Sequence, residues 1–448
     1  MRLLFPFCRS AVILAAALGA HAVQGADIVQ VYRDALVNDA QYMAARAAAE
    51  AGREKLPQGL AGLLPTIGAS ANTVWNENQY EASNRTDRIR KDYNTHAYNV
   101  SLTQPLFRWQ NIVQYGQAKL QVVQTEATFA QASQDLILRV AQAYFDVLNA
   151  EENLRAVRAN KQAIGQQLEQ AKKNFEVGTA TITDSQEAQS RYDLASAQEI
   201  AAENDLEVKR YALRVIVGKD YAALNRLRPD AELAPPKPAV MDEWVTAAES
   251  SSFAVQAQQA AADVAAKEVE RVRAGHYPTV DIVANYGKNN NALSFVGNDT
   301  LETTARNVGL QLNIPIFQGG VINSKTREAE ANRTAANATL EGVRRTAVLS
   351  ARQSYLGVVN GLAGINALKA ALVSSTSALE SNKLGYEVGV RINIDVLNAE
   401  QQVYNTKRDL AKVRFDTLLA QLKLKAAVGS LSEADLEQIN PLFELPAN

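Results

Sequence analysis

Two similar segments contain the polar side chains that are best placed for specific chemistry. FEVGTATITDSQEAQ begins at Phe175, and YEVGVRINIDVLNAE begins at Tyr386. Each contains a glycine, Gly178 or Gly389, that can end one helix in a left-handed conformation, so we expect a helix–turn–helix at each. The first chemistry to consider is helix capping, in which side-chain oxygens accept hydrogen bonds from free backbone N–H groups. Capping does not explain the hydroxyl of Tyr386 or the guanidinium of Arg391.

Residue type assigns candidate capping groups in both turns. Thr183 or Asp184 can cap the helix after the first turn, and Gln186 lies three residues beyond Thr183, as in a capping box. Asn393 or Asp395 can do the same after the second turn. For the two aspartates, capping and a functional role are equally good interpretations, and for Thr183 capping is favoured.

The rest of the chain offers little catalytic chemistry. It has three histidines and one cysteine in 448 residues. His96 and His276 lie near expected strand ends, where a structural role is the simpler interpretation, and no metal-ligand spacing or nucleophile motif accompanies them. We therefore expect no enzyme, no cofactor and no metal. The formal charge of −2 gives no reason to expect a nucleic-acid partner.

The N-terminus is typical of a secretory signal. Arg2 and Arg9 precede the apolar run AVILAAALGA, and AHA at 20–22 offers small residues for cleavage. The signal is expected to occupy residues 1–22. Cys8 precedes the apolar run, so we expect neither lipidation nor a disulfide in the exported chain. No later stretch approaches about 20 consecutive apolar residues, so no transmembrane helix is expected.

The two turn segments belong to a tandem duplication of the whole chain. The offset that aligns Gly178 with Gly389 also aligns Tyr144 with Tyr355, and the dipeptide VG at 217–218 with VG at 428–429. Upstream, LPTIGA matches YPTVDI, and QPLF matches IPIF, at slightly different offsets. A period of this length indicates two copies of a half-structure and not a solenoid.

Each copy is expected to contain a very long helix. No proline occurs between Arg108 and Val177 or between Gly320 and Val388. A helix of that length spans about 100 Å. Apolar residues recur every seven positions along both stretches, with small residues in the paired row, which indicates closely packed left-handed coiled coils.

Three segments alternate in the way that membrane strands do, and a fourth strand is expected at about 65–75. Residues 96–107, 279–286 and 306–317 place apolar residues on one face and polar residues on the other, which is the pattern of outer-membrane barrel strands and also of half-buried soluble sheets. The signal segment and the Asn-rich connections favour the barrel. Four strands cannot close a barrel, so closure must come from further copies, and three copies would supply twelve strands.

We therefore expect an α+β chain, mostly α, built from two helix–strand–strand–helix–helix units. The expected boundaries are a signal at 1–22, a first repeat at 23–226, a Pro-rich linker at 227–239, a second repeat at 240–435 and a C-terminal tail at 436–448. In the first repeat the strands are expected at about 65–75 and 97–107 and the helical hairpin at about 110–216. In the second repeat the strands are expected at about 278–287 and 306–317 and the hairpin at about 320–428.

The duplication, the motifs around the strands and the two VG turns together resemble the TolC-like outer-membrane efflux proteins, in their unlipidated branch. The resemblance implies a homotrimeric duct, with a twelve-stranded barrel in outer-membrane lipid and a helical tunnel in the periplasm of a Gram-negative cell. It implies a periplasmic membrane-fusion adaptor and an inner-membrane pump of RND or ABC type as partners. Drugs and proteins leave through the same architecture, so the cargo stays open.

The resemblance also implies roles for six residues. In this family a periplasmic gate is held shut by residues that match Thr183, Asp184, Tyr386 and Arg391, with Asp184 bonded to Tyr386 in one protomer and to Arg391 of a neighbour. A cation-selectivity ring matches Asp395 and Asn398. The family pattern has an aspartate at the second ring position, so we expect only modest cation selectivity and weak block by trivalent cations here.

Two other functions fit part of the pattern. A periplasmic coiled-coil adaptor would also have long helical hairpins, but it would not need four barrel-type strands. A passive porin would have the strands, but the long helices argue against it.

Overall fold

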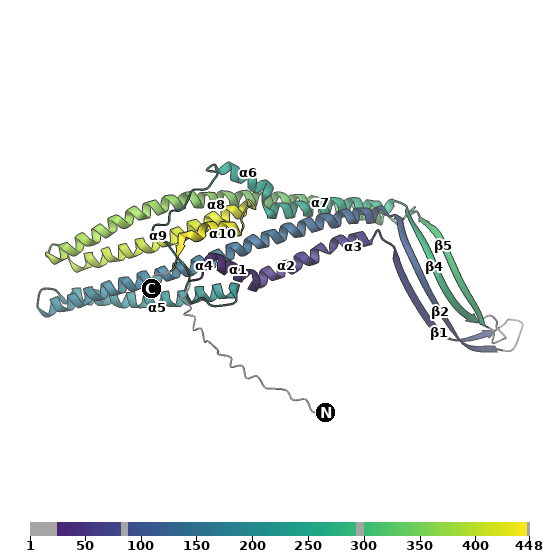
Figure 1. Ribbon diagram of the computed structural model, residues 1–448, viewed down its shortest axis with the longest axis horizontal. Helices are drawn as coiled ribbons and strands as arrows, with labels where there is room; N and C mark the ends of the chain where they lie inside the picture. Colours follow the sequence, from purple (N-terminus) through teal and green to yellow (C-terminus); the bar gives the residue numbers. More distant parts are fainter. Residues whose placement is uncertain (1–24, 82–87, 293–299, 446–448) are drawn as a thin grey trace, which may run out of the picture.

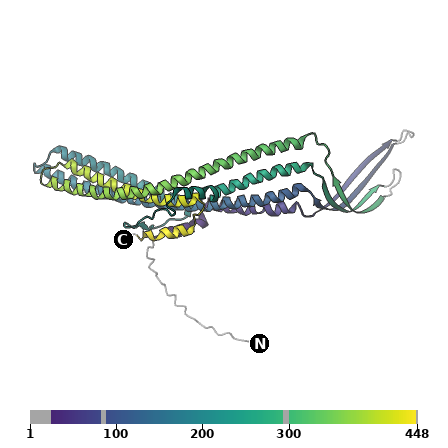
Figure 2. The same ribbon diagram turned by 90° about the horizontal axis from the view of Figure 1, so that it is seen from above.

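The computed structural model describes residues 25–81, 88–292 and 300–445, so the expected signal segment lies outside the described residues. The molecule is a long rod. The connecting turns of the two helical hairpins lie at one end of it, and a ribbon of strands continues from the helices at the other end (Figures 1 and 2). The order of elements repeats once along the chain, as the duplication predicts.

Both repeats contain short helices, two strands and a long helical hairpin. The elements of the first repeat are α1 (Ile28–Asn38), α2 (Ala40–Arg53), α3 (Lys55–Ala61), β1 (Thr66–Glu81), β2 (Arg88–Phe107), α4 (Trp109–Glu176) and α5 (Ile182–Val217). Those of the second are α6 (Met241–Ser251), α7 (Phe253–Arg273), β4 (Thr279–Ala292), β5 (Thr300–Asn313), α8 (Val321–Glu387) and α9 (Asn393–Ala427). The strands differ from the expected ranges: all four extend further toward the loops, and β5 also ends four residues early.

The four long strands form one antiparallel sheet in the order β1-β2-β4-β5. Its register lines up Ile67, Leu102, Ala284 and Val308 across all four strands. The neighbouring row is polar or small, and in it Asn285 donates a hydrogen bond of 3.1 Å to Asn307. The sheet therefore has one apolar face, which is exposed in the single chain, and one polar face.

An ion pair joins the two repeats where the strands meet the helices. Arg108 follows β2, and its Nε and Nη2 atoms donate to the carboxylate of Asp281 on β4 at 2.7 and 2.6 Å. The Asp281 side chain is buried. A two-point bond of this geometry fixes the angle at which α4 leaves the sheet.

The long helices lie side by side in a curved layer. Near the two turns, α4 contacts α5 on one side and α9 on the other, and α9 contacts α8 (Figure 1). Nearer the sheet, α7 lies between α4 and α8, while α2 and α3 cover the far side of α4. The layer therefore has two open edges, with α8 along one of them.

The largest core lies where the short elements wrap the middle of α4. Phe145 stacks between Phe415 and Phe443, with ring centroids 5.9 and 6.0 Å apart. The hydroxyl of Tyr144 donates to the backbone oxygen of Asn225 at 2.9 Å. Tyr144 and Phe145 are almost fully buried, so this core ties both repeats together.

The described part of the expected C-terminal tail at 436–448 contains regular secondary structure. A short helix, α10 (Glu433–Ile439), precedes a 3-10 turn and the strand β6 (Phe443–Glu444), which pairs with β3 (Arg226–Leu227). Leu436 is fully buried. The sequence pattern failed here because two-residue strands are too short to show a period.

One helix differs from the expectation that no helix can span a membrane. Part of α8 is long and apolar enough to do so by length and composition, and only 11% of that stretch is buried inside the chain. The whole helix has 67 residues, about three times what a bilayer requires. Its apolar side chains therefore remain available for contacts outside the single chain.

Candidate tip site

The two turns at the end of the rod have nearly the same backbone. Gly178 and Gly389 adopt φ angles of 79° and 77°, in the left-handed region where a side chain would be strained. In each turn the glycine N–H bonds back to the helix, to Phe175 at 3.0 Å and to Tyr386 at 3.1 Å. The prediction of a glycine-ended helix in both copies is confirmed.

The helix after the first turn is capped by Thr181, which is not one of the expected candidates, together with Asp184, which is one. Thr181 is the N-cap, and Asp184 completes a capping box by accepting from the Thr181 N–H at 3.0 Å and its hydroxyl at 2.8 Å. Thr183 is exposed and Gln186 is not part of the box. The T-x-x-D spacing from Thr181 was the signal that could have identified it.

The helix after the second turn begins without a side-chain cap. Ile392 occupies the N-cap position, and Asn393 is buried without capping. The carboxylate of Asp395 lies 3.5 Å from the guanidinium of Arg391, which is four residues earlier in the chain. The expected capping roles of Asn393 and Asp395 are therefore wrong, and the carboxylate of Asp395 is instead paired with the Arg391 side chain.

The predicted gate residues are only partly brought together in the single chain. The hydroxyl of Tyr386 accepts a hydrogen bond from Asn174 of α4 at 3.3 Å. Among the described residues no hydrogen bond joins Asp184 to Tyr386, because the carboxylate of Asp184 is bonded within its own turn. A contact between Asp184 and Arg391 of a neighbour would need a second copy.

The second position of the predicted ring also has a partner. Asn398 accepts a hydrogen bond from Arg191 of α5 at 3.2 Å, so a side chain of one hairpin binds a side chain of the other. Sequence reasoning missed Asn174 and Arg191. Both lie inside uninterrupted helices, where no motif distinguishes them from other polar surface residues.

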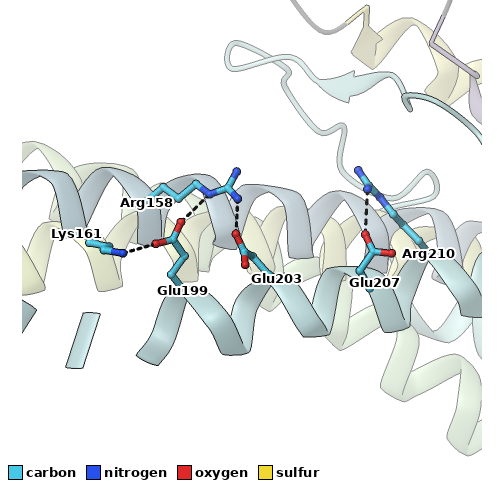
Figure 3. Close-up of polar contacts among 6 residues, drawn as sticks. All are labelled: Arg158, Lys161, Glu199, Glu203, Glu207 and Arg210. Carbon is cyan, nitrogen blue, oxygen red and sulfur yellow. Dashed lines mark hydrogen bonds and ion pairs between the residues drawn. The ribbon is translucent and has the colours of Figure 1, made fainter. Parts of the chain in front are cut away.

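Ion pairs stiffen the first hairpin. Figure 3 shows that Glu199 of α5 is held by Lys161 and Arg158 of α4, at 2.8 and 3.0 Å, and that Arg158 also reaches Glu203 at 2.5 Å. The bonds from Lys161 and Arg158 hold the pKa of Glu199 below its usual range. Networks of this kind restrict sliding between α4 and α5 more than an isolated pair would.

The second hairpin depends on close backbone approach and on an ion pair that involves one buried carboxylate. A Cβ atom on Gly361 of α8 would collide with the side chain of Thr417 on α9, so glycine is required for this spacing. Nearer the turn, Lys383 lies 3.4 Å from Glu400, which is buried. Burial raises the pKa of Glu400 in spite of the lysine.

Fold and site together define a class of membrane duct subunit: an amphipathic sheet at one end, long coiled helices, and polar contacts between two hairpin tips at the other end. No group of metal-ligating side chains occurs within the described ranges. The family described as outer membrane efflux protein matches residues 31–219 and 244–430. The chain belongs to this family.

Individual relatives agree over almost the full length. Outer membrane protein TolC of Vibrio cholerae is 32% identical over 95% of this chain and 96% of its own. Alkaline protease secretion protein AprF of Pseudomonas aeruginosa is 32% identical over 93% of this chain and 88% of its own. The crystal structure of the Campylobacter jejuni CmeC outer membrane channel superposes with a TM-score of 0.79 at 16% identity, covering 99% of this chain and 97% of that one.

Membership in the family settles the broad function. The protein is an outer-membrane exit duct of a Gram-negative cell with a periplasmic extension, and it is a transporter and not an enzyme. The expectations of the family, the location and the transport function are confirmed. The alternatives of a periplasmic adaptor and of a passive porin are set aside.

Proposed function

We propose that three copies of the chain close into one gated duct, with a twelve-stranded barrel in the outer membrane and a helical tunnel in the periplasm. The observation that carries the proposal is that every layer of the chain has two open edges. In the sheet these are β1 and β5. Unpaired strand edges are not tolerated in lipid, so each edge must pair with another copy.

The edge helices have the apolar rows that such pairing needs. On α5, Leu194, Val208 and Val215 are exposed at multiples of seven residues. On α8, Leu349 and Leu356, and then Val359 and Val373, are exposed at similar spacings. Packing α5 of one copy against α8 of the next would extend the coiled coil from copy to copy, and a head-to-tail contact of this kind closes into a ring.

Barrel size favours three copies. Two copies would supply eight strands, and an eight-stranded barrel is just wide enough for side chains to fill. Three copies supply twelve, which leaves an aqueous passage lined by the polar face that contains Asn285 and Asn307. The exposed apolar face, with Val308, Leu310 and Leu312 on β5, would then contact lipid.

The gate is proposed at the hairpin tips. Thr183, Asp184, Tyr386 and Arg391 lie within or beside the two turns, where an inward movement of six hairpins would narrow the passage. Between copies, a bond from Arg391 to Asp184 would contribute roughly 1.5 to 3 kcal/mol, strong enough to favour the closed form and weak enough to break.

We infer that a periplasmic membrane-fusion adaptor and an inner-membrane pump, of RND or ABC type, engage the tip end. The cargo is either drugs or proteins. AprF is by its name a protease secretion protein, and CmeC is described as an outer membrane channel.

The test of the proposal is the assembly state. Protein extracted from outer-membrane fractions in mild detergent should have a native mass of about three times the 48.6 kDa chain, less the cleaved segment. Boiling should convert it to monomer on a gel. A stable monomer in detergent-free buffer would contradict the proposed assembly of three copies.

A further inference from the structure

We propose that each subunit contains its own clasp, formed by Leu397, Asn398 and Arg191, which holds the α8–α9 hairpin against the α4–α5 hairpin when the duct is closed. The inference rests on the proposed gated duct. It adds Leu397 and Arg191 as positioning residues that act inside one chain, whereas the Asp184–Arg391 contact acts between chains.

Leu397 is the apolar part of the clasp. Its side chain is 3% exposed, although it projects from α9 at the thinly packed end of the rod. The other buried members of its cluster all come from the first hairpin: Ile164, Leu168 and Ala171 on α4, and Ala188 and Ala195 on α5. A leucine of the second hairpin therefore fills a socket made entirely by the first.

The socket is rigid because it is built on the stiffened hairpin. Tyr192 of α5 packs over Gly165 of α4, where an added Cβ would lie 3.4 Å from the ring. The ammonium of Lys161 lies 5.5 Å from the centroid of the same ring and also bonds to Glu199 (Figure 3). The walls of the socket thus hold their shape whether or not Leu397 is inserted.

Arg191 and Asn398 form the polar part at the same level. Arg191 precedes Tyr192, and Asn398 follows Leu397, so the 3.2 Å hydrogen bond between them lies beside the socket. The acceptor is a neutral amide, which makes the bond weaker than an ion pair. The combination gives a contact that is specific in position and readily broken.

Opening of the tip requires these contacts to break. If α8 and α9 swing away from the stiff first hairpin, Leu397 leaves its socket and Arg191 separates from Asn398. Weakening the clasp should therefore favour the open form even when every contact between copies is intact.

The experiment measures single-channel conductance of the full-length protein in planar lipid bilayers. Leu397→Ala and Arg191→Ala should each raise the conductance severalfold. Leu424→Ala is the control for the leucine, because Leu424 lies on the same helix and is 2% exposed but belongs to another cluster. Arg210→Ala is the control for the arginine, because Arg210 bonds to Glu151 and Glu207 within the first hairpin. Both controls should keep the wild-type conductance.

Strengthening the clasp should lower the conductance, whereas weakening it should raise the conductance. Asn398→Asp would convert the hydrogen bond to an ion pair and should lower the conductance below that of wild type, and Arg191→Ala should abolish this effect. If the Arg191 and Leu397 variants conduct like wild type while Tyr386→Phe with Arg391→Ser conducts more, the clasp is wrong and the gated duct stands. If wild type forms no channels, both proposals fall.

Discussion

At the scale of single residues, the proposed gate depends on side chains that the fold itself does not need. Tyr386 and Arg391 lie outside the buried cores. Tyr386→Phe removes only the bond from Asn174, and Arg391→Ser removes the ion pair with Asp395. Because net hydrogen bonds contribute about 1 kcal/mol each, the double variant should open the tip, raising conductance severalfold, while the melting temperature hardly moves.

A second tyrosine provides the control for this prediction. The hydroxyl of Tyr355 donates to the backbone oxygen of Ala239 at 2.6 Å, far from the tip on the same helix. Tyr355→Phe should leave the conductance unchanged. Equal effects of the two tyrosine changes would mean that Tyr386 only stabilises the turn.

The cation selectivity of the ring formed by Asp395 and Asn398 can be predicted at the same scale. Asp395 and Asn398 are three residues apart and share a helix face. Each has an arginine partner, Arg391 at 3.5 Å and Arg191 at 3.2 Å, which weakens the potential for cations beyond the loss of one carboxylate. We expect modest cation selectivity that Asp395→Ala abolishes, and only weak block by trivalent cations.

Adding a carboxylate at position 398 tests the cation-selectivity ring in the opposite direction from Asp395→Ala. Asn398→Asp should strengthen trivalent block clearly only when combined with Arg191→Gln, since Arg191 would otherwise neutralise the new carboxylate. The cation selectivity of the Asp395→Ala channel is measured by reversal potentials. An Asp395→Ala channel with unchanged selectivity would show that this carboxylate lies away from the passage.

Residue type predicted the position of the tip site but not its contacts. Gly178 and Gly389 could be identified because left-handed backbone strongly favours glycine. Thr183 and Asp184 are both capping candidates by residue type, whereas the N-cap is Thr181 and Asp184 completes its capping box, because two threonines two residues apart both suit a helix start. Asn174 makes a contact between hairpins, which depends on their packing and leaves no trace in local sequence.

At the scale of elements, the long helices were predictable because they satisfy two independent local rules, the absence of proline and a seven-residue apolar period. The strands could be recognised by alternation, but their outer ends could not, since polar residues occur on both faces once a strand rises above the apolar band. The short elements α6, α10 and β6 were missed, because the Trp244 and Phe443 side chains that anchor two of them bind surfaces formed by distant parts of the chain.

The junction of α1 and α2 yields a prediction of pH dependence. Asp39 ends α1 and caps α2, accepting from the Tyr42 N–H at 2.7 Å and from two Arg139 nitrogens at 2.7 and 2.9 Å. The bonds from Arg139 hold the pKa of Asp39 below its unfolded value of about 3.9. Its contribution to stability is therefore fully present above that value and is lost as the pH falls through the lower, folded pKa.

Replacing Asp39 should thus have a pH-dependent cost. Asp39→Asn should lower the stability at pH 7 by about 3 kcal/mol, because a mostly buried pair loses one partner, and the difference from wild type should shrink in acid. Melting temperatures at one scan rate, at neutral and at acidic pH, provide the measurement. Asp220→Asn, which removes an exposed partner of Arg214, should change little at either pH.

At the scale of the whole molecule, the open edges predict a separation between folding and assembly. Val208 of α5 is 55% exposed in the single chain, so Val208→Asp costs the subunit little. In the proposed ring it would bury a carboxylate against α8 of the next copy, and the trimer should be lost. Val240→Asp, at an exposed valine outside both edge helices, is the control and should leave the trimer intact on native gels.

Two unlike edges on every chain also have a genetic consequence. A subunit with one damaged edge still has a sound edge on its other side, so it can join intact subunits and prevent their ring from closing. If half the chains in a cell carry such damage, random mixing leaves roughly one ring in eight free of it, when each ring takes three chains. Alleles that alter the α5 or α8 edge should therefore be dominant over the wild type, whereas alleles that prevent a subunit from folding should be recessive.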